Sequence, residues 1–190
     1  MAWESLTPWI IGGLILVLMA GFVLYFVGVY NRFFSLKNSS EATLGQIRVG
    51  MKKRLDMIDQ LLGSVKSYAQ FEREILEKVT AMRARVGNAG PTDLNEIERE
   101  SRSVLGRLFA VAENYPDLKT STTVMNLMDA VRGVEEEIAR QRYTYNNISQ
   151  EYNTLVDVIP SNFVARLLGL GKLAYLEFEE AIATPPKIEF

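Results

Sequence analysis

The sequence predicts an all-α protein, in which an N-terminal transmembrane helix is followed by an antiparallel up-and-down helical bundle. Three observations support this class: an uncharged apolar stretch near the start, long series of apolar residues at steps of three and four, and no strand-like alternation or hairpin signal. The first and third helices of the bundle are expected to be long. The 160 residues that follow the apolar stretch suffice for one hydrophobic core.

The apolar stretch runs from Thr7 to Tyr30 and carries no formal charge. A bilayer core needs about 20 apolar residues in helical form, and in lipid a helix satisfies its own backbone hydrogen bonds. Residues 1–6 contain no Lys or Arg, and the apolar core is longer than that of a cleaved signal peptide. We therefore expect an uncleaved single-pass transmembrane helix over residues 7–30.

The charges that flank this helix predict its orientation. Arg32 and Lys37 follow it, whereas Glu4 is the only charged residue before it. The positive-inside rule then places the short tail, residues 1–6, outside the cell (inner) membrane and the large C-terminal part in the cytoplasm. The lipid bilayer is the first expected partner.

The composition excludes several function classes. All 21 Lys and Arg residues and 22 of the 23 acidic residues follow residue 30, which leaves that part with a net charge of −1. Nucleic acid is not expected as a partner, because phosphate binding needs a net basic face. The basic clusters Lys52–Arg54 and Arg83/Arg85 are interpreted as solvated helix faces.

The chain contains neither His nor Cys. The usual general base, the thiol nucleophile and most zinc ligands are therefore absent. The carboxylate groups Glu135–Glu137 and Glu179/Glu180 are interpreted as exposed helix charge. We expect a protein that is not an enzyme, with no catalytic, metal-binding or cofactor-binding residues.

Apolar residues recur at steps of three and four from Leu44 to Val86, which is the period of an amphipathic, coiled-coil-like helix. A first long helix is predicted over residues 31–86. Three glycines lie inside it, each costing about 1 kcal/mol against Ala, and close helix packing is the expected reason for them: Gly45, Gly50 and Gly63.

Turn formers and prolines divide the rest of the chain. Gly87–Pro91 breaks the pattern, Asp93 followed by Glu96 resembles a capping box, and Pro116 and Pro160 end helices. The predicted cytoplasmic bundle covers residues 31–183, with further helices over 93–114, 121–159 and 161–183, and a C-terminal tail over 184–190. Whether residues 161–183 pack on the bundle or lie on a membrane or a partner is left open.

Two Tyr-Asn pairs lie seven residues apart on the third helix, and two asparagines lie seven apart on the segment that leaves the membrane. A buried Asn costs stability unless it is hydrogen-bonded, but it fixes helix register. We interpret these residues as a structural polar layer that specifies how the first and third helices pack; a ligand-binding seam and plain surface exposure are the alternatives. The six residues are Asn31, Asn38, Tyr145, Asn146, Tyr152 and Asn153.

Several short motifs follow one another in a definite order along the chain. They are Tyr30–Asn38, Lys52–Ile58, Val65–Ala69 with Glu72, Ala110–Lys119, Tyr145-Asn146, Tyr152-Asn153, Ile159-Pro160, Asn162, Phe178-Glu179 and Pro186–Phe190. In this order the chain from Tyr30 onward resembles the LemA family of membrane-anchored helical proteins. It departs from the family pattern at Asp59, where members often have proline, and at Leu44 and Leu55, which replace Trp and His.

The resemblance implies a single N-terminal anchor, a short outside tail and a cytoplasmic up-and-down bundle. It supplies no molecular activity, because none is firmly assigned to the family, although one branch is associated with building magnetosome membranes. No catalytic residue is carried over.

The sequence favours a membrane-anchored scaffold or interaction module whose partners are other membrane proteins. The terminal residues are a candidate partner-binding tail, since two apolar side chains alternate with polar ones; packing on the protein's own bundle is the alternative. A homo-oligomer that organises membrane, with Asn31 and Asn38 setting register between subunits, is a second hypothesis, and a membrane sensor is a third. The tail residues are Pro186, Lys187, Ile188, Glu189 and Phe190.

Overall fold

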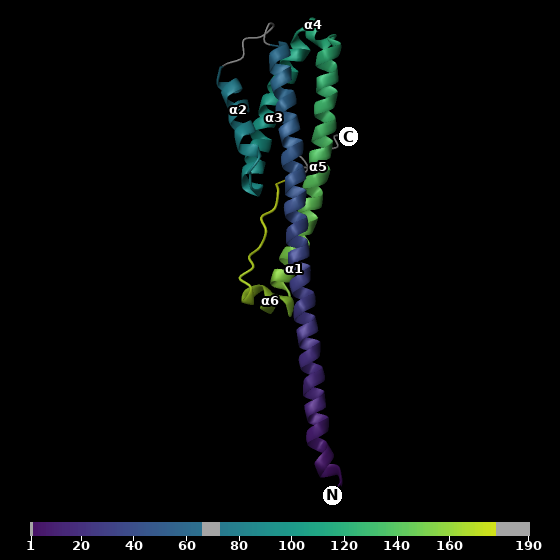
Figure 1. The fold of residues 1–190 in the computed structure, drawn as a ribbon. Helices are drawn as coiled ribbons and strands as arrows, with labels where there is room; N and C mark the ends of the chain where they lie inside the picture. The colour runs from purple at the N-terminus through teal and green to yellow at the C-terminus, as the bar shows by residue number, and fades with distance from the viewer. Residues whose placement is uncertain (1, 66–72, 178–190) are drawn as a thin grey trace, which may run out of the picture. The chain divides into compact units, whose positions relative to one another are not determined.

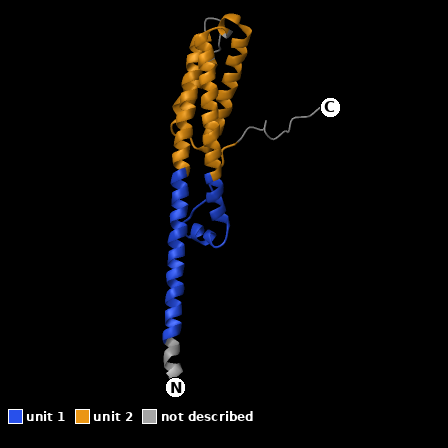
Figure 2. Cartoon of the chain, turned by 90° about the vertical axis from the view of Figure 1, so that its right-hand side faces the viewer, with its two compact units in different colours: residues 1–39, 148–173 blue, residues 40–147, 174–190 orange. Residues whose placement is uncertain are grey.

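The computed structural model describes residues 2–65 and 73–177, which contain helices and no strand (Figure 1). The predicted all-α class is confirmed. The helices are α1 (Ala2–Val65), α2 (Arg73–Val86), α3 (Pro91–Asn114), α4 (Pro116–Lys119), α5 (Thr122–Asp157) and α6 (Ser161–Leu167). The chain divides into unit 1, Met1–Ser39 with Ile148–Leu173, and unit 2, Ser40–Asn147 with Ala174–Phe190 (Figure 2).

Unit 1 contains the apolar part of α1. Among the described residues, this is the one helix long and apolar enough to cross a membrane. Its large apolar side chains are exposed, for example Phe22 at 68 % and Leu24 at 72 %. A core helix of a soluble protein would bury such side chains, so the exposure fits a helix whose apolar surface faces lipid.

A small apolar core follows the membrane-spanning part within unit 1. The ring of Phe33 on α1 meets the ring of Tyr152 on α5 edge-on, with centroids 5.4 Å apart. Leu36 and, from α6, Val164 and Ala165 complete this buried cluster. It fixes α6 to the helices beside it.

Unit 2 is a four-helix bundle made of the C-terminal part of α1, α2, α3 and the N-terminal part of α5. Successive helices run in opposite directions (Figure 1). Their apolar faces share one core, as the three-and-four periodicity requires. Its fully buried members include Leu55, Ile58, Met82, Ile97 and Val131.

The prediction of a single helix over residues 31–86 is wrong. Arg83 on α2 contacts Asp56 at 2.8 Å and Asp59 at 3.1 Å on α1. On one continuous helix, Asp59 and Arg83 would be about 36 Å apart, so α2 folds back along α1. Apolar spacing did not reveal this, because it repeats equally in a straight helix and in two antiparallel helices that share a core.

The helix predicted over residues 161–183 is also wrong beyond Leu167. Gly169 has a φ of +64°, and its amide donates to the Arg166 carbonyl at 3.2 Å. The next amide, of Leu170, donates to the Ala165 carbonyl at 2.9 Å. This is the Schellman arrangement that ends a helix at a left-handed glycine. Residues 170–177 continue without regular secondary structure, and residues 178–183 lie outside the described residues.

Smaller differences concern helix starts. The helix predicted from Asp93 begins at Pro91, since proline suits the first helical position. The Asp93 carboxylate accepts a hydrogen bond from the Gly90 amide at 3.2 Å. Asp93 therefore caps α3 from position N3, and Gly90 is the N-cap residue. The short helix α4 was not predicted.

Of the three glycines expected to allow close packing, Gly50 alone does so. A Cβ at Gly50 would lie 2.9 Å from Cγ1 of Ile138 on α5, whereas no group among the described residues lies within 4 Å of a Cβ at Gly45 or Gly63. Gly50 therefore allows α1 and α5 to approach each other in unit 2. The packing explanation is wrong for the other two.

We predict opposite effects for two glycine-to-alanine changes. Gly133 on α5 has open space around its Cβ position, so G133A should raise the free energy of unfolding by up to about 1 kcal/mol through helix propensity. In G50A the same gain is opposed by an overpacking cost of about 1–3 kcal/mol. Denaturant unfolding of both variants checks this, and G50A being as stable as G133A would contradict it.

Candidate functional site

The first Tyr-Asn pair, Tyr145-Asn146, binds backbone groups of residues 174–177, the extended segment of unit 2. The Asn146 side-chain amide donates to the Leu176 carbonyl at 2.7 Å and accepts from the Leu176 amide at 2.8 Å. The Tyr145 hydroxyl donates to the Ala174 carbonyl at 3.0 Å. Together they bind the segment as a neighbouring β-strand would, but with side-chain groups.

The second pair does the same within unit 1. The Asn153 amide donates to the Leu173 carbonyl at 3.0 Å and accepts from the Leu173 amide at 2.8 Å. The Tyr152 ring is buried against Phe33, and this burial raises the pKa of the Tyr152 phenol. Each Asn thus pairs both of its polar atoms with a single backbone residue.

The other predicted polar-layer residues are not part of this arrangement. Asn31 and Asn38 lie exposed on α1. The bonds of Asn146 and Asn153 run to the backbone of residues 173 and 176, so the structure brings these residues to an extended segment and not to another helix. The predicted tail, Pro186 to Phe190, lies outside the described residues.

Asn95 is a further residue of the segment's binding site and was not predicted from the sequence. It lies on α3, is 7 % exposed, and accepts a hydrogen bond from the Glu177 amide at 3.0 Å. A polar residue between Leu94 and Ile97 on an apolar helix face was the available signal. No short motif marked it.

A cluster of buried charges joins three helices of unit 2. The Arg54 guanidinium on α1 donates to both carboxylate oxygens of Glu98 on α3, at 3.2 and 2.7 Å. Arg102 donates to Glu98 Oε1 at 2.8 Å, and Arg142 on α5 lies 3.6 Å from the same oxygen. Ser101 also accepts from Arg54. Such bidentate, charge-assisted bonds fix geometry more firmly than neutral ones.

The interpretation of Arg54 as part of a solvated face is wrong, since its side chain is 1 % exposed. Glu135 lies 3.8 Å from the same guanidinium and is only partly exposed. A charged residue on an otherwise apolar helix face is buried when partners from neighbouring helices neutralise it. Lys52 and Lys53 are exposed, as expected.

The surroundings of Glu98 keep it ionised. Burial alone would raise its pKa, but Arg54, Arg102 and Arg142 outweigh burial and hold the pKa below its ordinary value. A carboxylate whose oxygens already accept several N–H bonds is a poor proton acceptor. The cluster is therefore suited to holding helices together.

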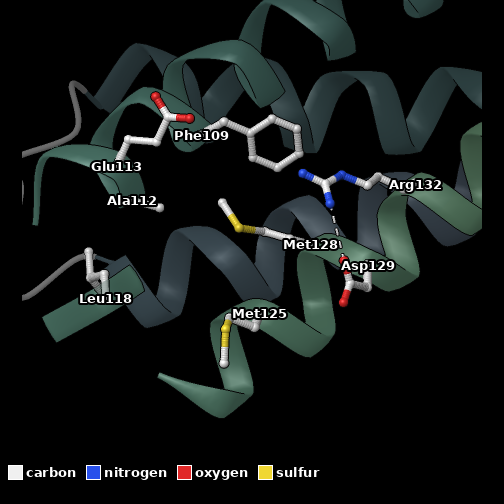
Figure 3. Close-up of a pocket in the computed structure, with 8 residues that line it drawn as sticks. All are labelled: Phe109, Ala112, Glu113, Leu118, Met125, Met128, Asp129 and Arg132. Atoms are coloured by element: carbon white, nitrogen blue, oxygen red, sulfur yellow. Dashed lines mark hydrogen bonds and ion pairs between the residues drawn. The ribbon is translucent and has the colours of Figure 1, made fainter. Parts of the chain in front are cut away.

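A pocket of about 350 Å³ opens where α3, α4 and α5 meet in unit 2 (Figure 3). The guanidinium of Arg132 turns to Asp129, at 3.3 Å. Among the lining residues, thioether and apolar side chains prevail, which suits an apolar side chain of a partner. They are Phe109, Ala112, Glu113, Leu118, Met125, Met128, Asp129 and Arg132.

These features define a membrane-associated helical protein: a four-helix bundle and one apolar helix able to span a bilayer. The model of the LemA family matches residues 43–190, which is most of the chain. The chain belongs to the LemA family. The earlier resemblance is confirmed.

Individual relatives agree with this assignment. Protein LemA from Metamycoplasma hominis is 28 % identical over 161 residues, covering 84 % of this chain and 74 % of the relative. Magnetosome protein MamQ 2 from Paramagnetospirillum magneticum is 23 % identical over 183 residues, covering 82 % and 67 %. Magnetosome protein MamQ from Magnetospirillum gryphiswaldense is 21 % identical with the same coverage.

We predict that E98Q destabilises the protein and weakens its response to acid. Because the folded pKa of Glu98 is lowered from 4.5, its contribution is complete above about pH 4.5 and is lost as the pH falls through the folded value. E98Q leaves buried guanidinium groups without their carboxylate, which should cost about 3–5 kcal/mol at neutral pH. Denaturant unfolding from pH 3 to 7 measures both effects.

The matched control is E136Q, because Glu136 is exposed and pairs only with Arg140 on its own helix among the interactions described. Its stability should change by no more than about 0.5 kcal/mol. A pH profile for E98Q parallel to that of the unchanged protein would contradict the role of Glu98.

Proposed function

We propose that this protein is a non-catalytic scaffold, anchored in the cell membrane by residues 7–30, whose bundle binds other membrane proteins on the cytoplasmic face. One observation carries the proposal: a helix with exposed apolar side chains belongs to the same chain as a folded bundle with its own core. Such a chain holds a protein surface beside a bilayer.

Residue chemistry supports a role without catalysis. The chain has no His and no Cys. The buried carboxylate of Glu98 is occupied by guanidinium groups inside the bundle. The residues that line the pocket of unit 2 offer binding surface, with no nucleophile next to a general base among them.

The flanking charges support the cytoplasmic placement of the bundle. Arg32 and Lys37 follow the apolar helix directly, and both belong to the short region where basic residues set topology. The candidate surfaces for partners are then the pocket of unit 2 and the tail Pro186 to Phe190.

A second candidate function is a homo-oligomer that organises membrane. Its support is the similarity to two proteins named for the magnetosome. The exposed Asn31 and Asn38 offer amide groups for pairing between copies.

We predict that the N-terminus and the bundle label from opposite sides of the membrane. Because the protein lacks Cys, A2C and S103C each supply one thiol, the latter at an exposed position of α3. In intact spheroplasts a membrane-impermeant maleimide should label A2C and leave S103C unmodified. After lysis both should react, which is the control for accessibility. Labelling of S103C in intact spheroplasts would contradict the cytoplasmic bundle.

We predict that the pocket of unit 2 contacts partner proteins in cells. A photo-crosslinking amino acid at Met125, which lines the pocket and is 44 % exposed, should give defined adducts with other membrane proteins. Arg140, exposed on the same helix but absent from the pocket lining, is the matched control and should give few. The same adducts from both positions would remove the pocket as the binding surface.

A further inference from the structure

The binding site for the extended segment in unit 2 forms its hydrogen bonds with backbone groups of the segment. Tyr145, Asn146 and Asn95 pair four of them: the Ala174 carbonyl, both groups of Leu176 and the Glu177 amide. Every peptide carries such groups, so these bonds recognise an extended conformation and not a particular side chain. The three side chains come from α3 and α5, which are held together by the bundle core.

Two side chains of the segment add selectivity. Leu176 is 2 % exposed and belongs to the bundle core. Glu177 lies 3.8 Å from Arg99, and both are exposed. Tyr175, which directly precedes Leu176, is 48 % exposed. The site therefore takes an extended peptide with a buried aliphatic residue followed by an acidic one.

The chain that leads into the segment is built to change direction. Gly169 has a φ of +64°, and Gly171 follows two residues later. Within the described part of the chain, no other group lies within 4 Å of a Cβ position on either glycine. Glycine tolerates many backbone conformations, so the chain can turn here once the Gly169 and Leu170 amide bonds and the packing of Leu170 are released.

We propose that this is an exchangeable peptide-binding site, occupied by residues 174–177 of its own chain and able to take the same segment from a second copy. Each copy carries both the site and its complementary segment, so exchange replaces the four hydrogen bonds of residues 174–177 and the buried Leu176 with equal ones. The two bonds between Leu173 and Asn153 open as the segment leaves. Anchoring in one membrane raises the local concentration of copies. In that respect alone the inference rests on the proposed function.

The absence of Cys allows a direct test with full-length protein. Two differently tagged chains, R99C and E177C, are co-expressed in one membrane and treated with a short bifunctional maleimide. Exchange places the two thiols side by side on different chains, so an adduct carrying both tags is expected. The double variant R99C/E177C should crosslink within one chain, which shows that the substituted protein folds and that the reagent spans the distance.

A further change, N146A, is placed in one chain or in the other, which distinguishes segment exchange from crosslinking by random collision of two chains. In the R99C chain it damages the receiving site and removes two hydrogen bonds, which should lower the mixed adduct about tenfold. In the E177C chain it damages a site that the adduct does not use, so the yield should hold or rise. N146A should also leave the bundle folded, which the double variant with N146A tests by its unfolding transition.

Equal yields from the two N146A placements, or no mixed adduct while the double variant crosslinks, would overturn the exchange. Neither result alters the labelling sides of A2C and S103C or the adducts from Met125. A failure of the scaffold proposal would appear in those measurements instead. The exchange proposal and the scaffold proposal can therefore be contradicted independently of each other.

Discussion

The carboxylate of Glu98 is the point on which the bundle of unit 2 depends. It lies on α3 and accepts bonds from Arg54 on α1, while Arg142 on α5 lies beside it. Apolar faces of three-and-four period pack in more than one register, because one turn resembles the next. A buried charge tolerates no such slip, since displacement leaves it unpaired. This single cluster therefore fixes how three helices align, and Gly50 allows two of them to come close.

Local patterns in the sequence sufficed for the fold class and for the bounds of α3 and α5. Apolar period, turn glycines and prolines act over a few residues, so α3 and α5 were predicted to within two residues. The reversal between α1 and α2 was not, because the direction of a helix depends on partners distant in sequence. Arg54 was misplaced for a similar reason. Its neighbours Lys52 and Lys53 are exposed, and its burial depends on partners distant in sequence, among them Glu98, 44 residues away.

The candidate site shows which features of a structure residue patterns can predict and which they cannot. Tyr145-Asn146 and Tyr152-Asn153 were recognisable as polar residues at helical spacing, and all four lie at buried or half-buried positions. Their partners were not recognisable, because a backbone carbonyl or amide leaves no trace in a sequence. Gly169 and Gly171 were local signals that the helix stops, and the left-handed φ of Gly169 ends α6.

The Arg54–Glu98 ion pair and the hydrogen bonds to residues 174–177 differ in how easily they break. Breaking the Arg54–Glu98 pair strands charges inside the bundle, at a cost of about 3–5 kcal/mol. Each neutral bond to the extended segment contributes only about 1 kcal/mol net, and an identical segment or water replaces it. Opening of the folded bundle should therefore begin at residues 174–177 and leave the helices aligned. This difference in stability suits the proposed scaffold, because the bundle keeps its shape while the contacts of the segment change.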